Sequence, residues 1–114
     1  MSDCLFCKIV AGEIPCDQVH ADADFLAFRD INPQAPVHIL IIPKEPIATL
    51  NELEPGHAEL MGKLVLAATD IAREEGLTDD GYRVVINCNR GGGQMVFHIH
   101  LHLLGGRQMT WPPG

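Results

Sequence analysis

Apolar and polar side chains alternate along residues 97–106, which read FHIHLHLLGG. A period of two predicts a β-strand, because successive side chains of a strand point to opposite faces of a sheet. His98, His100 and His102 are therefore expected on one face, and the apolar residues between them on the other, toward a core. Neighbours on the same face lie about 6.6 Å apart at a strand rise of about 3.3 Å per residue. We expect the three imidazoles to form a row that surrounds one small anionic group.

Two segments earlier in the chain also have strand patterns. Residues 18–29 hold two short apolar runs on either side of a turn-like Asp-Ala-Asp, which predicts a β-hairpin. Residues 37–43 are apolar except for His38 and predict a central strand. On that strand His38 is expected to share a face with Leu40 and Ile42.

Helical periodicity appears between Pro55, a typical first helical residue, and Gly76, a typical residue after a helix end. Apolar residues recur there at spacings of three and four, which predicts one long amphipathic helix. They are Leu60, Met61, Leu64, Ala68, Ile71 and Ala72. After this helix, residues 82–88 predict one more strand, which leads into a glycine-rich segment.

Composition limits the classes of protein that the chain can belong to. Its 114 residues, 46% hydrophobic and 20% charged, are enough for one globular domain with one core. A net charge of −7 disfavours nucleic-acid polymers, because lysine and arginine must neutralise many phosphates there. The longest apolar run, residues 39–42, is too short to span a bilayer, and the N-terminus lacks a secretory signal. We expect a soluble cytoplasmic protein without a membrane partner, whose four cysteines are free thiols or metal ligands.

The histidine row has three interpretations, namely a solvated polar face, a three-histidine metal site, or metal-free phosphate chemistry. The segment Arg90–Gln94 favours the third, because it carries three consecutive glycines. Backbone N–H groups of such a segment approach an anion closely, since glycine has no Cβ. Its spacing is neither that of a Walker loop nor that of a dinucleotide fingerprint. Beside a histidine row, the segment is expected to cradle a phosphate.

Three other features each have two interpretations. Cys4 and Cys7 share one face if residues 4–12 are helical, and they are either half of a zinc site or two ordinary thiols. Asp30 begins a proline-rich loop, where it either caps a turn or binds a sugar hydroxyl. Trp111, next to two prolines, either packs on its own chain or docks on a second subunit and walls a site there.

The sequence resembles the histidine triad (HIT) family, and within it the nucleotide-binding Hint branch. Residues 98–104 match the family signature of three histidines separated by apolar residues, and the stretches FRDINPQAP, IIPK and GGRQMTWPPG extend the resemblance over about Phe6–Gly114. The resemblance implies an α+β fold with a five-stranded antiparallel sheet, one short helix and one long helix. It also implies a single HIT domain over residues 1–114 and a homodimer with a continuous sheet, at whose interface the tail 105–114 packs.

The resemblance further implies a hydrolase of purine nucleotides that forms a nucleotidyl-histidine intermediate on His100, with His98 and His102 as further catalytic residues. No cofactor is implied for this catalysis. The implied substrate-binding residues are Phe6, Phe28, Asp30, Ile31, Leu40, Asn87, Gly93, Gln94, Met95, His100, His102 and Trp111. A structural zinc ion is implied on Cys4, Cys7, His38 and His98.

Three residues depart from the family pattern: Met95 stands where a serine is common near the phosphate, and Thr110 and Pro46 replace histidines. The chemistry itself needs no metal, because a neutral imidazole is a usable nucleophile toward phosphorus at pH 7. A departing amine needs a proton, which favours a nucleoside phosphoramidate of the adenosine 5′-monophosphoramidate type as the substrate. The alternatives are a dinucleoside polyphosphate hydrolase of the same superfamily and a nucleotide-binding regulatory scaffold.

Overall fold

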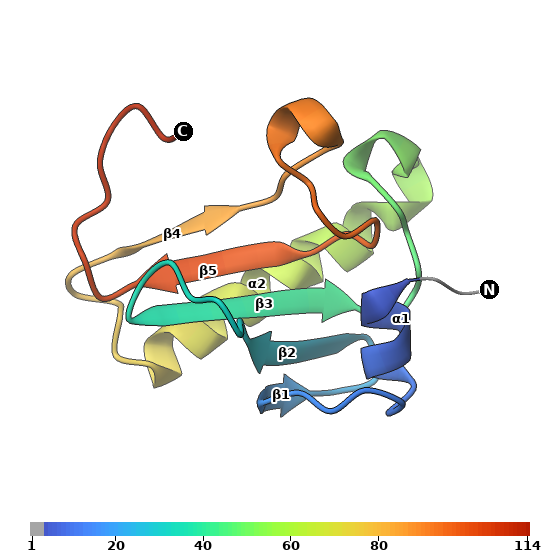
Figure 1. The fold of residues 1–114 in the computed structure, drawn as a ribbon, viewed down its shortest axis with the longest axis horizontal. Coiled ribbons are helices and arrows are strands. Elements are labelled where there is room, and N and C mark those ends of the chain that lie inside the picture. Colours follow the sequence, from blue (N-terminus) through green and yellow to red (C-terminus); the bar gives the residue numbers. More distant parts are fainter. Residues whose placement is uncertain (1–3) are drawn as a thin grey trace.

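The computed structural model describes residues 4–114, which form one five-stranded antiparallel sheet flanked by two α-helices (Figure 1). The strands are β1 (Gln18–Ala21), β2 (Phe25–Arg29), β3 (Val37–Pro43), β4 (Tyr82–Val85) and β5 (Leu101–Gly105), in the spatial order β1-β2-β3-β5-β4. The helices are α1 (Leu5–Val10) and α2 (Ala58–Glu74), and three 3₁₀ turns are η1 (Leu50–Glu52), η2 (Pro55–His57) and η3 (Arg90–Gly92). The predicted α+β fold with one short and one long helix is confirmed.

The two faces of the sheet bury different apolar clusters. Side chains alternate along β3, so Ile39 and Ile41 pack in the cluster that α2 covers, while Leu40 and Ile42 pack in a second cluster with Phe6 of α1. Figure 1 shows α2 crossing behind the sheet and α1 standing at one end of it. The face that α2 leaves uncovered therefore carries α1.

The predicted hairpin and central strand are confirmed. β1 and β2 pair antiparallel, and the turn between them is held by Asp22, whose Oδ1 accepts hydrogen bonds of 2.8 Å from the amides of Asp24 and Phe25. β3 covers the predicted residues and pairs with β2 on one side and β5 on the other. The histidine-bearing segment therefore lies next to the most buried strand.

The last strand is shorter than its alternation predicts, because β5 begins at Leu101 rather than Phe97. The register pairs Ile41 with Leu101, which would set Ile99 opposite Pro43. Proline has no amide hydrogen for a ladder, so pairing ends there, and the amide of Ile99 donates instead to the carbonyl of Ile47 at 2.7 Å. β4 ends at Val85 rather than at residue 88, and Val85 pairs with His102 of β5.

The predicted long helix is confirmed as α2, preceded by η2, which starts at Pro55. Its C-terminus is closed by Gly76 with φ +76°, and the amides of Gly76 and Leu77 donate back to the carbonyls of Arg73 and Ala72. This pair of bonds is the Schellman arrangement that glycine permits at a helix end. Across residues 4–114 no helix combines the length and the apolar character needed to cross a membrane.

Candidate active site

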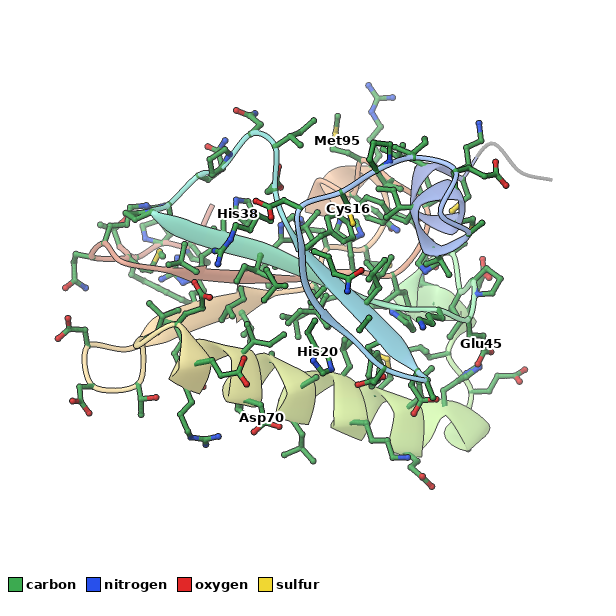
Figure 2. The ribbon with its side chains drawn as sticks, turned by 90° about the horizontal axis from the view of Figure 1, so that it is seen from below. Cys16, His20, His38, Glu45, Asp70 and Met95 are labelled. Carbon is green, nitrogen blue, oxygen red and sulfur yellow. The ribbon has the colours of Figure 1, made fainter. Side chains whose placement is uncertain are left out.

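A cavity of about 330 Å³ opens on the face of the sheet that carries α1, and its size suits a small organic ligand. Its lining includes the predicted residues Phe6, Phe28, Asp30, Ile31, Leu40, Asn87, Gly93, Met95, His100 and His102. It also includes a wall that sequence reasoning missed, formed by Leu5, Ile9, Ile14, Pro15, Cys16, Asp17, Arg29 and Val96. Figure 2 shows Cys16 and Met95 near α1, on the side of the sheet opposite α2.

One wall of the cavity is aromatic and lies directly against the nucleophile candidate. The Phe6 ring, which is 4% exposed, meets Phe28 edge-on at a centroid distance of 5.6 Å. The same ring meets His100 edge-on at 5.0 Å. An apolar wall of this kind contacts a flat aromatic ligand favourably. The cavity thus places an aromatic-binding surface next to an imidazole.

His100 is held in a single tautomer. Its Nδ1 donates a 2.8 Å hydrogen bond to the backbone carbonyl of His98, so Nδ1 carries the proton and Nε2 keeps its lone pair. Burial lowers the pKa of His100 below its ordinary value, although the bond to His98 and the charge of Asp30 oppose that shift. The ring is therefore neutral at pH 7 and has a free nitrogen, which is the state that a nucleophile needs.

His102 sits next to His100, with ring centroids 4.9 Å apart. Burial, and then the neighbouring rings of His100 and His38, lower the pKa of His102 to about 4. Its Nδ1 lies 2.9 Å from Nε2 of His38, a residue whose side chain is 4% exposed. Burial also lowers the pKa of His38, although the charge of Asp30 opposes that shift. Both imidazoles are therefore neutral at pH 7 and joined by one hydrogen bond.

His98 does not join the other two histidines around one anion, so the expectation of three imidazoles on one group is wrong. Its Nδ1 lies 3.4 Å from the Sγ atoms of both Cys4 and Cys7, and its Nε2 donates to the carbonyl of Pro43 at 2.7 Å. The cause is that the segment leaves the strand ladder before Leu101 and turns this ring toward the start of α1. His98 is 1% exposed and lies outside the cavity lining.

The Cys4, Cys7 and His98 donors fit a zinc ion as three ligands. A tetrahedral zinc with bonds of about 2.3 Å to sulfur and 2.0–2.1 Å to nitrogen separates sulfur and nitrogen by about 3.6 Å, close to the 3.4 Å seen here. The bond from His98 to Pro43 fixes the tautomer that leaves Nδ1 free for a metal. The three donor atoms lie within 4.8 Å of one another.

The assignment of His38 to this zinc site is wrong. His38 is the second residue of β3, whereas His98 bonds to Pro43 at its other end. Five residues of a strand span about 16 Å, too far for a shared metal. Figure 2 shows His38 at the end of β3 away from α1. Among residues 4–114, the donor group of Cys4, Cys7 and His98 holds no fourth ligand.

The glycine-rich segment forms η3 and ends at Gly93, whose φ of +85° favours glycine. Gly93 lines the cavity, as does Asn87, which precedes the segment. Gln94 has a different place, since its buried amide donates to the carbonyls of Ala48 and Val96 and accepts from the amide of Asn89. The side chain of Gln94 therefore holds the glycine-rich segment in place through hydrogen bonds to the backbone. Its contact with a phosphate stays a prediction.

Asp30 caps a turn, which is one of the two interpretations of its position, and its role in binding a sugar hydroxyl stays a prediction. Its Oδ1 accepts a 2.8 Å hydrogen bond from the amide of Asn32, which is a turn cap, while the residue also lines the cavity beside Ile31.

Trp111 is 82% exposed and does not line the cavity within this one chain. Its predicted role therefore requires a second chain.

Together, the fold and the cavity define a class of site in which a neutral histidine lines a cavity that suits a small organic ligand. The HIT domain model matches residues 11–109, which is most of the chain. The chain therefore belongs to the HIT domain family, as its resemblance implied.

Relatives of known sequence and structure agree with this membership. A HIT family hydrolase from Legionella pneumophila has a solved structure that is 60% identical, covers 98% of this chain and 100% of its own, and superposes with a TM-score of 0.97. The 14 kDa zinc-binding protein of Zea mays is 56% identical over 99% of this chain and 89% of its own. The purine nucleoside phosphoramidase of Escherichia coli K12 is 51% identical over 92% of this chain and 88% of its own.

Proposed function

We propose that this protein is a nucleoside phosphoramidate hydrolase that cleaves the P–N bond through a nucleotidyl-histidine intermediate on His100. The observation that carries the proposal is the 2.8 Å bond from His100 Nδ1 to the His98 carbonyl, which leaves Nε2 as a free nucleophile inside the cavity. Similarity to the Escherichia coli phosphoramidase and to the Legionella hydrolase supports the same reaction class.

In the first proposed step, the lone pair of His100 Nε2 attacks the α-phosphorus, the N–P bond to His100 forms, and the P–N bond of the substrate breaks. The leaving amine takes one proton from a water molecule in the open cavity, and the proton that water gives up in the second step returns to solvent. In the second step a water molecule attacks the same phosphorus, gives up a proton, and releases His100 and a nucleoside monophosphate. Backbone donors near Gly93 and the side chain of Asn87 are suited to stabilise the charge on the non-bridging oxygens.

The same cavity suggests how a purine nucleotide is held. The apolar rings of Phe6 and Phe28, with Leu40, form the wall for the base. Asp30 and Ile31 lie at the cavity edge, where the carboxylate of Asp30 suits ribose hydroxyls. Met95 is 86% exposed at the mouth and offers a thioether, a weak acceptor without a proton to donate. The departing group therefore meets an apolar side chain there.

We further infer that the protein works as a homodimer. β4 is an edge strand of the sheet, so one of its sides is open to pairing with another strand. Tyr82 and Val84 of β4 are 37% and 43% exposed, and Trp111 of the tail is more exposed still. Pairing of two β4 strands would make the sheet continuous, cover these side chains and bring the tail 105–114 to the interface.

A zinc ion on Cys4, Cys7 and His98 is proposed as structural. When bound, it would clamp the start of α1 to the segment before β5 and so stabilise the wall that Phe6 contributes. The nucleophile is not among these ligands, and no step of the proposed reaction passes through the metal.

The test is turnover of adenosine 5′-phosphoramidate against diadenosine polyphosphate by the wild type and by His100→Ala. We expect release of AMP from the phosphoramidate, a slower reaction with the dinucleotide, and loss of turnover in His100→Ala with nucleotide binding kept. Faster cleavage of the dinucleotide would favour the polyphosphate hydrolase. Nucleotide binding without turnover of either compound would favour the scaffold.

A further inference from the structure

His38 lies outside the HIT signature and is linked by hydrogen bonds to a backbone amide on one side and to His102 on the other. The amide of Gln34 donates a 3.0 Å hydrogen bond to Nδ1 of His38. An amide N–H is always a donor, so Nδ1 must be an acceptor and cannot carry a proton. Neutral His38 therefore carries its one ring proton on Nε2.

That proton has two acceptors within reach at different distances. Nε2 of His38 lies 2.9 Å from Nδ1 of His102 and 3.5 Å from Oδ2 of Asp30. Only the first distance lies in the range of a good N–H hydrogen bond, so His38 donates to His102. His102 Nδ1 is then an acceptor, and the ring proton of neutral His102 sits on Nε2.

Asp30, His38 and His102 also bring one carboxylate and two imidazole nitrogens within 4.8 Å of one another, a set that resembles a metal site. The backbone argues against that interpretation. A metal on Nε2 of His38 would need a lone pair there, which would place the proton on Nδ1, against the amide proton of Gln34. The trio is therefore a hydrogen-bonded chain rather than a ligand set.

From this chain of bonds we infer that His38 is a positioning residue that fixes His102 as a hydrogen-bond donor, with its Nε2–H available to the phosphoryl group of the substrate. The inference rests on the proposed function only for the identity of the ligand, namely a substrate with a phosphoryl group. The tautomer of His102 follows from Gln34 and His38 alone.

The consequence is that two adjacent imidazoles are held in opposite tautomers. His100 has its proton on Nδ1 and a lone pair on Nε2, while His102 has a lone pair on Nδ1 and its proton on Nε2. Their rings are 4.9 Å apart and both line the cavity. One ring is thus suited to attack phosphorus and its neighbour to donate to the oxygens that gain charge. The backbone of Gln34 and of His98 sets the two roles.

The experiment reads the tautomers directly, by long-range ¹H–¹⁵N NMR of the histidine rings at pH 7, in protein without substrate. In the wild type we expect His38 and His102 as Nε2–H tautomers and His100 as the Nδ1–H tautomer. His38→Phe keeps a ring of similar shape without the donor, and should convert His102 to a mixture of tautomers. His38→Gln keeps an N–H donor and should restore the Nε2–H form. His20→Gln, on β1 and outside the cavity, should leave His102 unchanged.

Kinetics of the same variants on adenosine 5′-phosphoramidate supply the functional readout. We expect kcat to fall about 10- to 100-fold in His38→Phe with KM within about threefold, and to recover to within about fivefold in His38→Gln. A wild-type spectrum with His102 protonated on Nδ1 overturns the inference even if no variant folds. So does a folded His38→Phe protein whose His102 stays in the Nε2–H form. If the wild type shows the expected tautomers but no turnover, the proposed function fails and the assignment of His38 stands.

Discussion

The two ends of the histidine row do different things, although the residue type is the same. At one end, His98 faces two thiols and bonds to the carbonyl of Pro43, in a setting suited to a metal. At the other end, His102 faces His38 and opens into the cavity, in a setting suited to phosphate chemistry.

The difference comes from what packs beside each ring. α1 brings Cys4 and Cys7 to the end of β3, whereas the start of β3 carries His38. A period-two pattern therefore predicts which face a histidine occupies but not which partner it meets. The four predictions below act on one end of the row, on the wall between the ends, or on the tail, and are ordered by expected size.

The largest effect is expected from Phe6→Ala, because this ring contacts both His98 and His100 and is 4% exposed. Removing it leaves a void between α1 and the sheet, and should lower the free energy of unfolding by about 3–4 kcal/mol in urea titrations. Leu5→Ala, on the same helix but 43% exposed, is the matched control and should cost less than about 1.5 kcal/mol. Equal losses of unfolding free energy in Phe6→Ala and Leu5→Ala would show that the Phe6 ring does not support both ends of the histidine row.

Metal removal should act on the His98 end alone. Zinc held at 100 times its dissociation constant stabilises a protein by about 2.7 kcal/mol, so chelation should lower the thermal midpoint of zinc-loaded protein by several degrees. The initial rate of phosphoramidate cleavage should not change, since His100 attacks without a metal. Cys7→Ser provides the control, because its midpoint should respond less to a chelator. If chelation stops turnover of folded protein and zinc restores it, the metal-hydrolase interpretation replaces this account.

Acid should destabilise the folded protein, because the folded state disfavours the protonation of His102. Burial lowers the pKa of His102 to about 4, whereas an unfolded histidine takes up its proton near pH 6.5. The unfolded state therefore binds more protons as pH falls from about 6.5 to about 4, and the free energy of unfolding falls over that window. Metal-free wild type should lose about 2 kcal/mol more than His102→Gln between pH 7 and pH 4.5 in urea titrations. Identical losses would contradict a His102 that stays neutral in the folded protein down to about pH 4.

The smallest effect is expected at the tail, where Trp111→Ala should change selectivity among leaving groups. In a homodimer the Trp111 ring would touch only the departing amine of the neighbouring site. The rate with bulky amines should therefore fall by about tenfold or less relative to the rate with ammonia. A uniform loss across amines contradicts that role. Sedimentation that shows a monomer at micromolar concentration removes it altogether.

Much of the architecture follows from local patterns. The hairpin, the central strand, the long helix and its end at Gly76 each have a signal within a few residues, namely alternation, a turn sequence or a cap. β5 was expected to be longer, because alternation continues through Ile99 while the partner strand ends at Pro43. Strand length depends on both partners, and that information is not local.

The site divides in the same way. The lining residues on strands and the glycine-rich loop carry recognisable signals, whereas the wall from Ile14 to Asp17 carries none. His38 was assigned to the wrong partners, since the spacing of His38 and Cys4 in sequence says nothing of the strand end at which each lies. Gln94 is predicted to contact phosphate, which stays a prediction, and the bonds from its side chain to three backbone groups have no signal in the sequence. Such choices depend on tertiary packing.

The central claim is that His100, and neither of its neighbours, forms the covalent intermediate. The most direct measurement is peptide mapping by mass spectrometry after rapid mixing with adenosine 5′-phosphoramidate and denaturation at neutral to alkaline pH. The account predicts one added AMP, located on His100, that forms within a single turnover and then decays as AMP appears. An adduct on His98 or His102, or full turnover without any adduct on His100, would contradict it.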